Sequence, residues 1–135
     1  QVVAELVKPK TNSAVAAITR EVFIPLGSGS TNSLDWTDTG AQAYVDTAVY
    51  PSLKTAYLQA SLKSNSGMVF ARLVQKNENA VVPGSEINHD TPTSTFKTSA
   101  EALLSAGNKL YGVQLKSETG QDVFLENSRL RLVLK

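Results

Sequence analysis

The residues that could support catalysis are few. His89 is the single histidine of the 135 residues, and the chain has no cysteine. A Ser-His-Asp arrangement would need His89 as its base, and no Gly-x-Ser-x-Gly turn is present to expose a serine nucleophile. His89 lies in the polar run 88–92, which predicts a solvated loop histidine. We therefore predict that the protein is not an enzyme and that His89→Ala leaves its behaviour unchanged.

Carboxylates near residue 36 suggest the best metal candidate. Asp35 and Asp38 are three residues apart, Gly40 follows them, and Asp46 comes soon after. Calcium prefers several carboxylate and carbonyl oxygens in a loop, and a glycine lets the backbone turn around the ion. Aspartate also forms turns through bonds from its side chain to the backbone, so these residues could be turn formers only. The sequence thus suggests a structural calcium at Asp35, Asp38 and Asp46, and no other cofactor.

Aromatic side chains gather in the same part of the chain. Trp36 is the only tryptophan, and Tyr44, Tyr50 and Tyr57 follow it closely in the sequence. Exposed aromatic rings can stack on the C–H face of a sugar, so these four residues are candidates for a glycan-stacking platform. The competing interpretation places Trp36 in the core or at one end of the domain.

The N-terminal segment is apolar on both phases of an extended strand. One phase holds Val2, Ala4 and Leu6, and the other holds Val3 and Val7. A strand buried on both faces has this pattern. Residues 8–13 follow as a polar tether that contains a proline, so the strand could pair with a sheet of another copy, as in β-augmentation. An ordinary first strand of its own sheet is the alternative.

The elements that position these residues follow a period of two. Apolar residues recur at every second position over 58–63, 69–73, 111–116 and 129–135, and a fifth such pattern covers 21–26. Such alternation is typical of half-buried antiparallel strands. In the last segment it predicts Leu130, Leu132 and Leu134 inside, with Arg129 and Arg131 on the solvent face.

Turn-forming residues separate the predicted strands. Hairpin loops are expected at 64–67, 105–108 and 118–121, and a turn at 82–85. Residues 27–33 have the composition of a mobile loop or hinge. Strands that recur every 8–12 residues predict an all-β fold, a two-sheet antiparallel β-sandwich of jelly-roll character. Residues 1–135 are expected to form one such domain, with 1–13 as the donor strand and tether.

Composition excludes some partners. The chain has 13 basic and 12 acidic residues, a net charge of +1, so it lacks the basic surface of a dedicated nucleic-acid binder. Its apolar runs are too short to span a membrane. Gln1 at the first position suggests a mature extracellular or cell-surface chain after removal of a signal peptide, with proteolytic trimming as the alternative.

Several short motifs appear in order between residue 55 and the end. They are a Tyr-led strand at 57–63, Phe-Ala-Arg-Leu at 70–73, Val-Pro-Gly-Ser-Glu at 82–86, Tyr-Gly-Val-Gln at 111–114 and Ser-Arg-Leu at 128–130. In this order they resemble an extracellular jelly-roll-like β-sandwich domain of prokaryotic secreted and surface proteins. The resemblance implies an adhesive or carbohydrate-associated module and no catalytic residues.

Three functions are compatible with these sequence features. The leading hypothesis is a non-enzymatic extracellular structural protein that assembles with copies of itself into a filament, pilus or surface layer through residues 2–7. The alternative is a carbohydrate-binding or adhesive module that uses Trp36 and its neighbouring tyrosines, with glycans as partners. The third is a decoration protein on a virus capsid.

Overall fold

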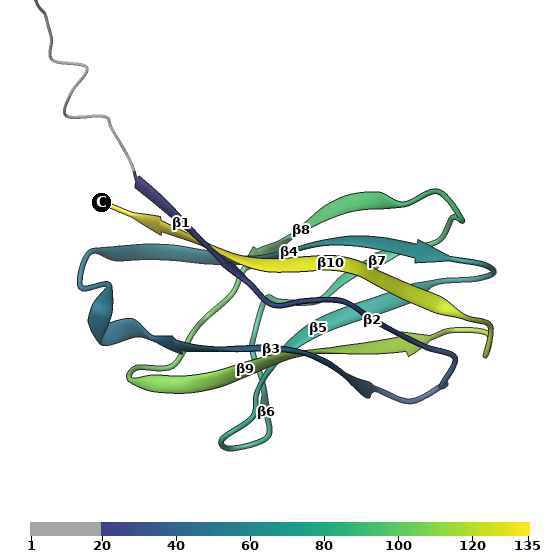
Figure 1. Cartoon of the computed structure of the whole chain (residues 1–135), viewed down its shortest axis with the longest axis horizontal. Helices are drawn as coiled ribbons and strands as arrows, with labels where there is room; N and C mark the ends of the chain where they lie inside the picture. Colours follow the sequence, from purple (N-terminus) through teal and green to yellow (C-terminus); the bar gives the residue numbers. More distant parts are fainter. Residues whose placement is uncertain (1–19) are drawn as a thin grey trace, which may run out of the picture.

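The computed structural model describes residues 20–135, which form two antiparallel sheets packed face to face (Figure 1). Residues 2–7 and the tether 8–13 lie outside the described residues. Sheet I contains five strands: β1 (Arg20–Pro25), β2 (Gly29–Thr31), β4 (Leu53–Ser64), β8 (Thr95–Glu101) and β10 (Val123–Leu134). Its order is β1-β10-β4-β8, and β2 pairs with β10 beyond the end of β1.

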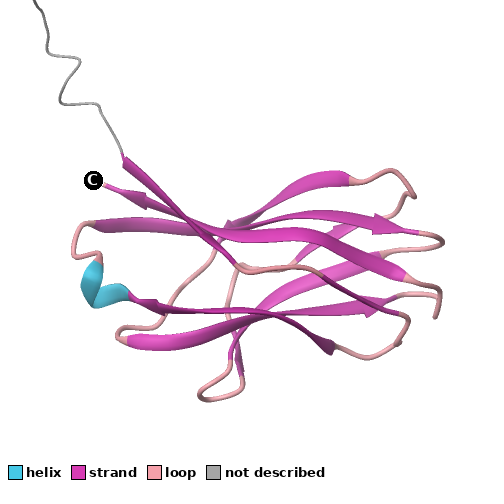
Figure 2. Ribbon diagram, in the orientation of Figure 1, coloured by secondary structure: helices cyan, strands magenta, loops and turns pink. Residues whose placement is uncertain are grey.

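Sheet II also contains five strands: β3 (Thr37–Asp46), β5 (Val69–Gln75), β6 (Ala80–Val81), β7 (Ile87–His89) and β9 (Asn108–Ser117). Its order is β3-β9-β5-β6, and β7 pairs with the first half of β5. A single 3₁₀ turn, η2 (Thr47–Val49), follows β3 in the described part of the chain (Figure 2). These two antiparallel sheets confirm the predicted two-sheet antiparallel sandwich.

No helix within residues 20–135 is long and apolar enough to cross a membrane.

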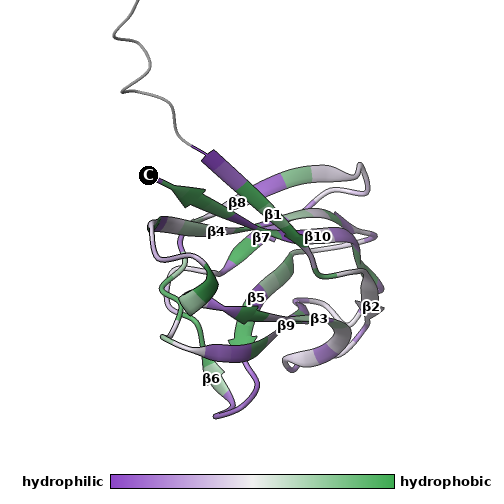
Figure 3. Cartoon of the chain, turned by 60° about the vertical axis from the view of Figure 1, so that its left-hand side comes forward, coloured by the Kyte–Doolittle hydropathy of each residue, from purple (hydrophilic) through white to green (hydrophobic). Residues whose placement is uncertain are grey.

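The core lies between the two sheets and follows the period of two. Hydrophobic and hydrophilic residues are both present along the strands (Figure 3), and every second residue is buried from Ala56 to Ser64 of β4 and from Tyr111 to Ser117 of β9. In β10, Leu130 and Leu132 are completely buried and Leu134 is nearly so, whereas Arg129 and Arg131 are partly exposed. The predicted register of the last strand is therefore confirmed.

The segment 27–33 differs from its prediction as a mobile loop or hinge. Residues 29–31 form β2, which pairs with residues 123–125 of β10. The backbone continues the edge of sheet I that β1 begins, because Leu26 N–H donates to the Ser128 carbonyl at 2.9 Å. The prediction was wrong because it relied on the glycine- and serine-rich composition of this segment. Strand pairing uses backbone groups and requires no particular side chain.

His89 is buried, so its prediction as a solvated loop histidine was wrong. It ends β7, and its side chain faces inward with 9% exposure, because β7 alternates buried, exposed, buried. Its Nε2 lies 2.7 Å from the Thr91 hydroxyl and 3.1 Å from the Thr93 carbonyl oxygen. The imidazole therefore connects the 90–94 loop to sheet II through its contacts with Thr91 and Thr93, and it is shielded from solvent.

Replacing His89 should consequently destabilise the protein. We expect His89→Ala to lower the free energy of unfolding by about 1–3 kcal/mol, because it removes buried volume and a satisfied polar contact. Asn88→Ala is the matched control, since Asn88 is the exposed neighbour on the opposite side of the strand. Urea denaturation of both variants tests this expectation. Equal midpoints for the two variants and the parent would contradict it.

Among residues 20–135, Tyr111 is the largest completely buried side chain. Its hydroxyl accepts a hydrogen bond from the Ser105 backbone N–H at 3.0 Å. Burial raises the pKa of Tyr111 above its ordinary value, and the bond from Ser105 partly opposes that rise. The unfolded chain therefore ionises at this position at a lower pH than the folded protein.

This difference predicts a loss of stability at alkaline pH. The contribution of Tyr111 is fully present below the ordinary tyrosine pKa of about 10 and is lost as pH rises from there through the higher folded-state value. Tyr111→Phe should show a shallower decrease in unfolding free energy above about pH 10. Denaturant melts of parent and variant at several alkaline pH values measure the slope, and identical slopes would contradict the expectation.

Candidate functional site

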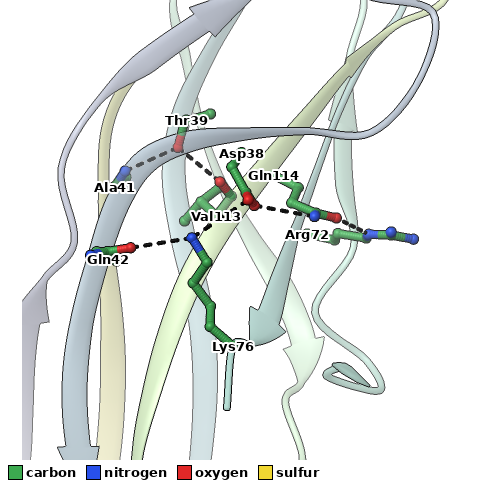
Figure 4. Close-up of polar contacts among 8 residues, drawn as sticks. All are labelled: Asp38, Thr39, Ala41, Gln42, Arg72, Lys76, Val113 and Gln114. Carbon is green, nitrogen blue, oxygen red and sulfur yellow. Dashed lines mark hydrogen bonds and ion pairs between the residues drawn. The ribbon is translucent and has the colours of Figure 1, made fainter. Parts of the chain in front are cut away.

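Polar side chains on the outer face of sheet II form one connected row, which we call the polar row. Arg72 Nε donates to Gln114 Oε1 at 3.0 Å, and Gln114 Nε2 donates to Asp38 Oδ1 at 3.2 Å (Figure 4). The Lys76 ammonium lies 3.6 Å from Asp38 Oδ2 and donates to Gln42 Oε1 at 3.2 Å. These five residues come from or directly follow β5, β9 and β3, so the row crosses three neighbouring strands.

A bulge in β3 brings two members of the polar row together. Asp38 pairs with Gln114 and Gln42 pairs with Gly112, so four steps along β3 match two steps along β9. In a regular strand, Asp38 and Gln42 would be separated by about 13 Å. Here one ammonium contacts both side chains, because the extra residues shorten the distance between them.

Thr39 closes the bulge. Its hydroxyl donates to the Val113 carbonyl at 2.8 Å and accepts the Ala41 N–H at 3.2 Å, as Figure 4 shows. Gly40 takes a positive φ of 85° between them, a conformation that a residue with a side chain adopts at a cost. The local sequence Thr-Gly therefore produces the bulge on which the polar row depends.

Lys76 reaches β3 by passing over β9 at Gly112, a position that has no side chain. Gly112 lies between the end of β5 and β3, and a Cβ at this position would be 2.9 Å from Lys76 Cδ. The glycine leaves room for the aliphatic part of Lys76 to cross β9. The Lys76–Asp38 ion pair is partly exposed, so it orients the two side chains more than it stabilises the fold.

Trp36 lies at one end of the polar row, in a group that we call the aromatic–cation cluster. The Arg72 guanidinium carbon is 4.1 Å from the centre of the indole, and the Lys116 ammonium is 5.0 Å from it. Lys116 is also 5.0 Å from the Phe70 ring, which meets the indole edge to face at 6.4 Å. Trp36 therefore packs on the outer face of sheet II and holds cations over its ring.

Two opposing effects act on the pKa of Arg72. Burial beside these side chains lowers the pKa of Arg72, and the nearby carboxylate of Glu86 acts in the opposite direction. A guanidinium remains protonated in proteins, so Arg72 presents a fixed positive charge. Because its Nε is bonded to Gln114, the terminal N–H groups keep a defined direction.

The four aromatic residues predicted as one glycan platform are divided between separate places. Trp36 and Tyr44 belong to the outer face of sheet II, near opposite ends of β3, and Tyr44 is 66% exposed. Tyr50 packs against the core. Tyr57 is on β4 of sheet I, where the Arg131 guanidinium lies 5.4 Å from its ring. The structure thus brings Trp36 and Tyr44 to one face and removes the other two from it.

The three aspartates predicted as calcium ligands do not come together. Asp38 is engaged with Lys76 and Gln114 in the polar row. Asp46 caps η2 by accepting the Ala48 N–H at 3.0 Å, at the far end of β3 from Asp35. Residues 20–135 contain no group of three His, Asp or Glu residues placed to hold a metal ion. The competing interpretation, that aspartates here form turns and caps, holds for Asp46.

Chemically, the polar row offers alternating donors and acceptors on an open surface. Arg72 and Lys76 donate, Asp38 accepts, and the amides of Gln42 and Gln114 do both. Such a surface suits a ligand with many hydroxyl groups. Sequence reasoning missed Arg72, Gln42, Lys76 and Gln114, since each appears only as an ordinary polar residue within a strand or directly after one.

Comparisons with known proteins support the fold. No protein-family model matches the chain, and no curated protein sequence matches it. The chain is similar in structure to the CBM36-1 domain of a multidomain xylanase from the hindgut metagenome of Trinervitermes trinervoides. The TM-score is 0.54 at 11% identity, and the match covers 84% of this chain and 96% of that one.

Two further structures are more distant. One is a carbohydrate-binding module CBM36 in complex with calcium and xylotriose, with a TM-score of 0.48, 12% identity, and coverage of 78% of this chain and 98% of that one. The other is a family two carbohydrate esterase from Cellvibrio japonicus, with a TM-score of 0.36, 11% identity, and coverage of 87% and 35%. At such identities the comparison concerns the fold alone. The likeness to the CBM36-1 domain supports the jelly-roll-like β-sandwich fold of this chain.

Proposed function

We propose that this chain is a non-catalytic carbohydrate-binding protein and that the polar row binds an extended polysaccharide. The observation that carries the proposal is the row itself, five hydrogen-bonded side chains that cross three strands of an open sheet face. The fold shared with a carbohydrate-binding module supports it. Such a protein would act outside the cell, where polysaccharides lie.

The row fits a sugar chain for physical reasons. Sugar hydroxyls exchange bonds with water for bonds with side chains, and bonds to charged groups are the stronger ones, about 1.5–3 kcal/mol each. The side chains of the row already hold one another in place, so little conformational entropy is lost on binding. The exposed ring of Tyr44 extends the same face and offers a surface for the C–H side of a sugar.

Affinity electrophoresis and calorimetry with soluble xylan, glucomannan and β-glucan test the proposal. We expect binding of at least one polymer, reduced about tenfold or more by Gln114→Ala and by Tyr44→Ala. Tyr57→Ala is the matched control, because Tyr57 lies on sheet I, and it should bind as the parent does. Failure of every neutral polysaccharide to bind, or equal binding by all variants, would reject the polar row as the site.

An incomplete edge of sheet I favours a second candidate function, self-assembly through residues 2–7. β8 pairs with β4 only as far as Tyr57 opposite Glu101, and residues 53–55 of β4 pair with β10 on their other side. Within the described chain nothing pairs with the remaining edge of 53–55. A cavity of about 180 Å³ opens there, lined in part by Leu53, Ala102 and Leu104.

An apolar strand from another copy would fit this edge. Backbone pairing would add a strand to sheet I beside residues 53–55, and one phase of Val2, Ala4 and Leu6 would enter the cavity. Removal of residues 1–8 should then leave a folded but monomeric protein, whereas the whole chain forms polymers visible by electron microscopy. Leu6→Asp should weaken assembly in the same direction. Polymers that form equally well without residues 1–8 would exclude this second candidate.

A further inference from the structure

Arg129 lies between two exposed phenylalanine rings on the outer face of sheet I. Its guanidinium carbon is 4.1 Å from the centre of the Phe23 ring and 5.5 Å from that of Phe96. The rings are 43% and 53% exposed. Arg129 Nε donates to Gln59 Oε1 at 2.8 Å, and the buried amide of Gln59 donates to the Thr98 hydroxyl at 3.3 Å. The guanidinium is thus held by a hydrogen bond to Gln59 and by the rings of Phe23 and Phe96 on either side.

Four neighbouring strands build this arrangement. The order β1-β10-β4-β8 places Phe23, Arg129, Gln59 and Phe96 on successive strands. All four belong to the face of sheet I turned away from the core, so the partly exposed cation has aromatic rings on two sides. Sequence alternation predicted an exposed Arg129 but not its aromatic neighbours, which are distant in the chain.

Within residues 20–135 no carboxylate pairs with Arg129, whereas its basic neighbours Arg131 and Lys63 on this face have acidic partners. Arg131, two residues further along β10, donates through Nε to Glu21 at 3.0 Å. The Lys63 ammonium lies 3.4 Å from Glu126. Arg129 forms no ion pair with any residue of 20–135, and its terminal N–H groups meet no acceptor in that range. A guanidinium held in this way, with terminal donors that residues 20–135 leave unused and with apolar rings beside it, is suited to a planar anion attached to an apolar ring.

We propose that this surface binds a uronic acid unit of an acidic polysaccharide. The sugar carboxylate pairs with the terminal N–H groups of Arg129, and the C–H face of the pyranose ring packs against Phe23 or Phe96. A neutral sugar would leave the cation unpaired, and a simple carboxylate would leave the rings exposed, so both features together select a uronate. The site is on the opposite face of the sandwich from the polar row and does not depend on the function proposed for that row.

Calorimetry with oligogalacturonate and with its methyl ester tests the proposal. We expect the acid to bind at least about tenfold more tightly than the ester, and Arg129→Gln to remove that preference. Arg131→Gln is the matched control, because Glu21 already neutralises Arg131, and it should change the affinity by less than about threefold. Phe96→Ala should weaken binding of the acid while the melting temperature stays close to that of the parent.

Other outcomes would overturn the proposal. Equal losses with Arg129→Gln and Arg131→Gln would indicate general attraction to positive charge, and so would equal binding of polyglutamate. Gln114→Ala separates this site from the polar row, because it should bind oligogalacturonate normally whatever happens to neutral polysaccharides. Loss of oligogalacturonate binding in Gln114→Ala would place the uronate on sheet II and refute the assignment to Arg129.

Discussion

Leu132→Ala is expected to lower the free energy of unfolding by about 2–5 kcal/mol. Leu132 is completely buried in β10, which lies between β1 and β4. Its partners in the neighbouring strands are Val22 of β1 and Ala56 of β4. Truncation removes apolar contacts and leaves a cavity that neighbouring strands cannot close, because the backbone pairing on both sides holds them in register. Chemical denaturation at neutral pH measures the loss directly.

Arg131→Ala is the control for Leu132→Ala. Arg131 is the adjacent residue of the same strand and faces solvent, where it pairs with Glu21 and lies over the Tyr57 ring. Partly exposed pairs of this kind contribute about 1 kcal/mol or less. Similar losses in the two variants would contradict the register of β10, since the inward and outward positions would then be energetically equivalent.

The long strands could be predicted because burial on one face leaves a period of two in the sequence. Leu58, Leu62 and Val113, for example, are buried at the inward positions of strands predicted from alternation. Short strands carry no such signal. β2 and β7 have three residues each, and their pairing with β10 and β5 comes from backbone groups that every residue possesses. His89 was assigned to a loop for this reason.

The candidate sites could be predicted only in part. Alternation correctly identifies Arg129 as outward-facing, and composition draws attention to Trp36 and Asp38. Which outward side chains meet depends on strand order and on the bulge in β3, and neither is encoded in a local pattern. Arg72 and Gln114, for instance, become neighbours only when β5 pairs with β9. The predicted aromatic platform failed because proximity along the chain was taken for proximity in space.

Gly84→Ala is expected to be among the most damaging single substitutions in the described chain. Gly84 has a φ of +82°, and a Cβ at this position would overlap the carbonyl oxygen of Glu101 at the end of β8. The turn that contains Gly84 joins the two sheets here, because Leu103 N–H donates to the Pro83 carbonyl at 3.1 Å. Relief of the overlap therefore requires separation of backbone segments rather than rotation of a side chain.

The expected cost of Gly84→Ala combines two effects. The left-handed conformation costs an L residue about 1–2 kcal/mol, and overpacking against rigid backbone adds about 1–3 kcal/mol. Gly107→Ala separates them, since Gly107 has a φ of +93° but no atom within 4 Å of its would-be Cβ, so only the first cost applies. Thermal and denaturant melts should place Gly107→Ala between the parent and Gly84→Ala. Equal destabilisation would mean that backbone conformation, and not the close approach to β8, requires glycine at position 84.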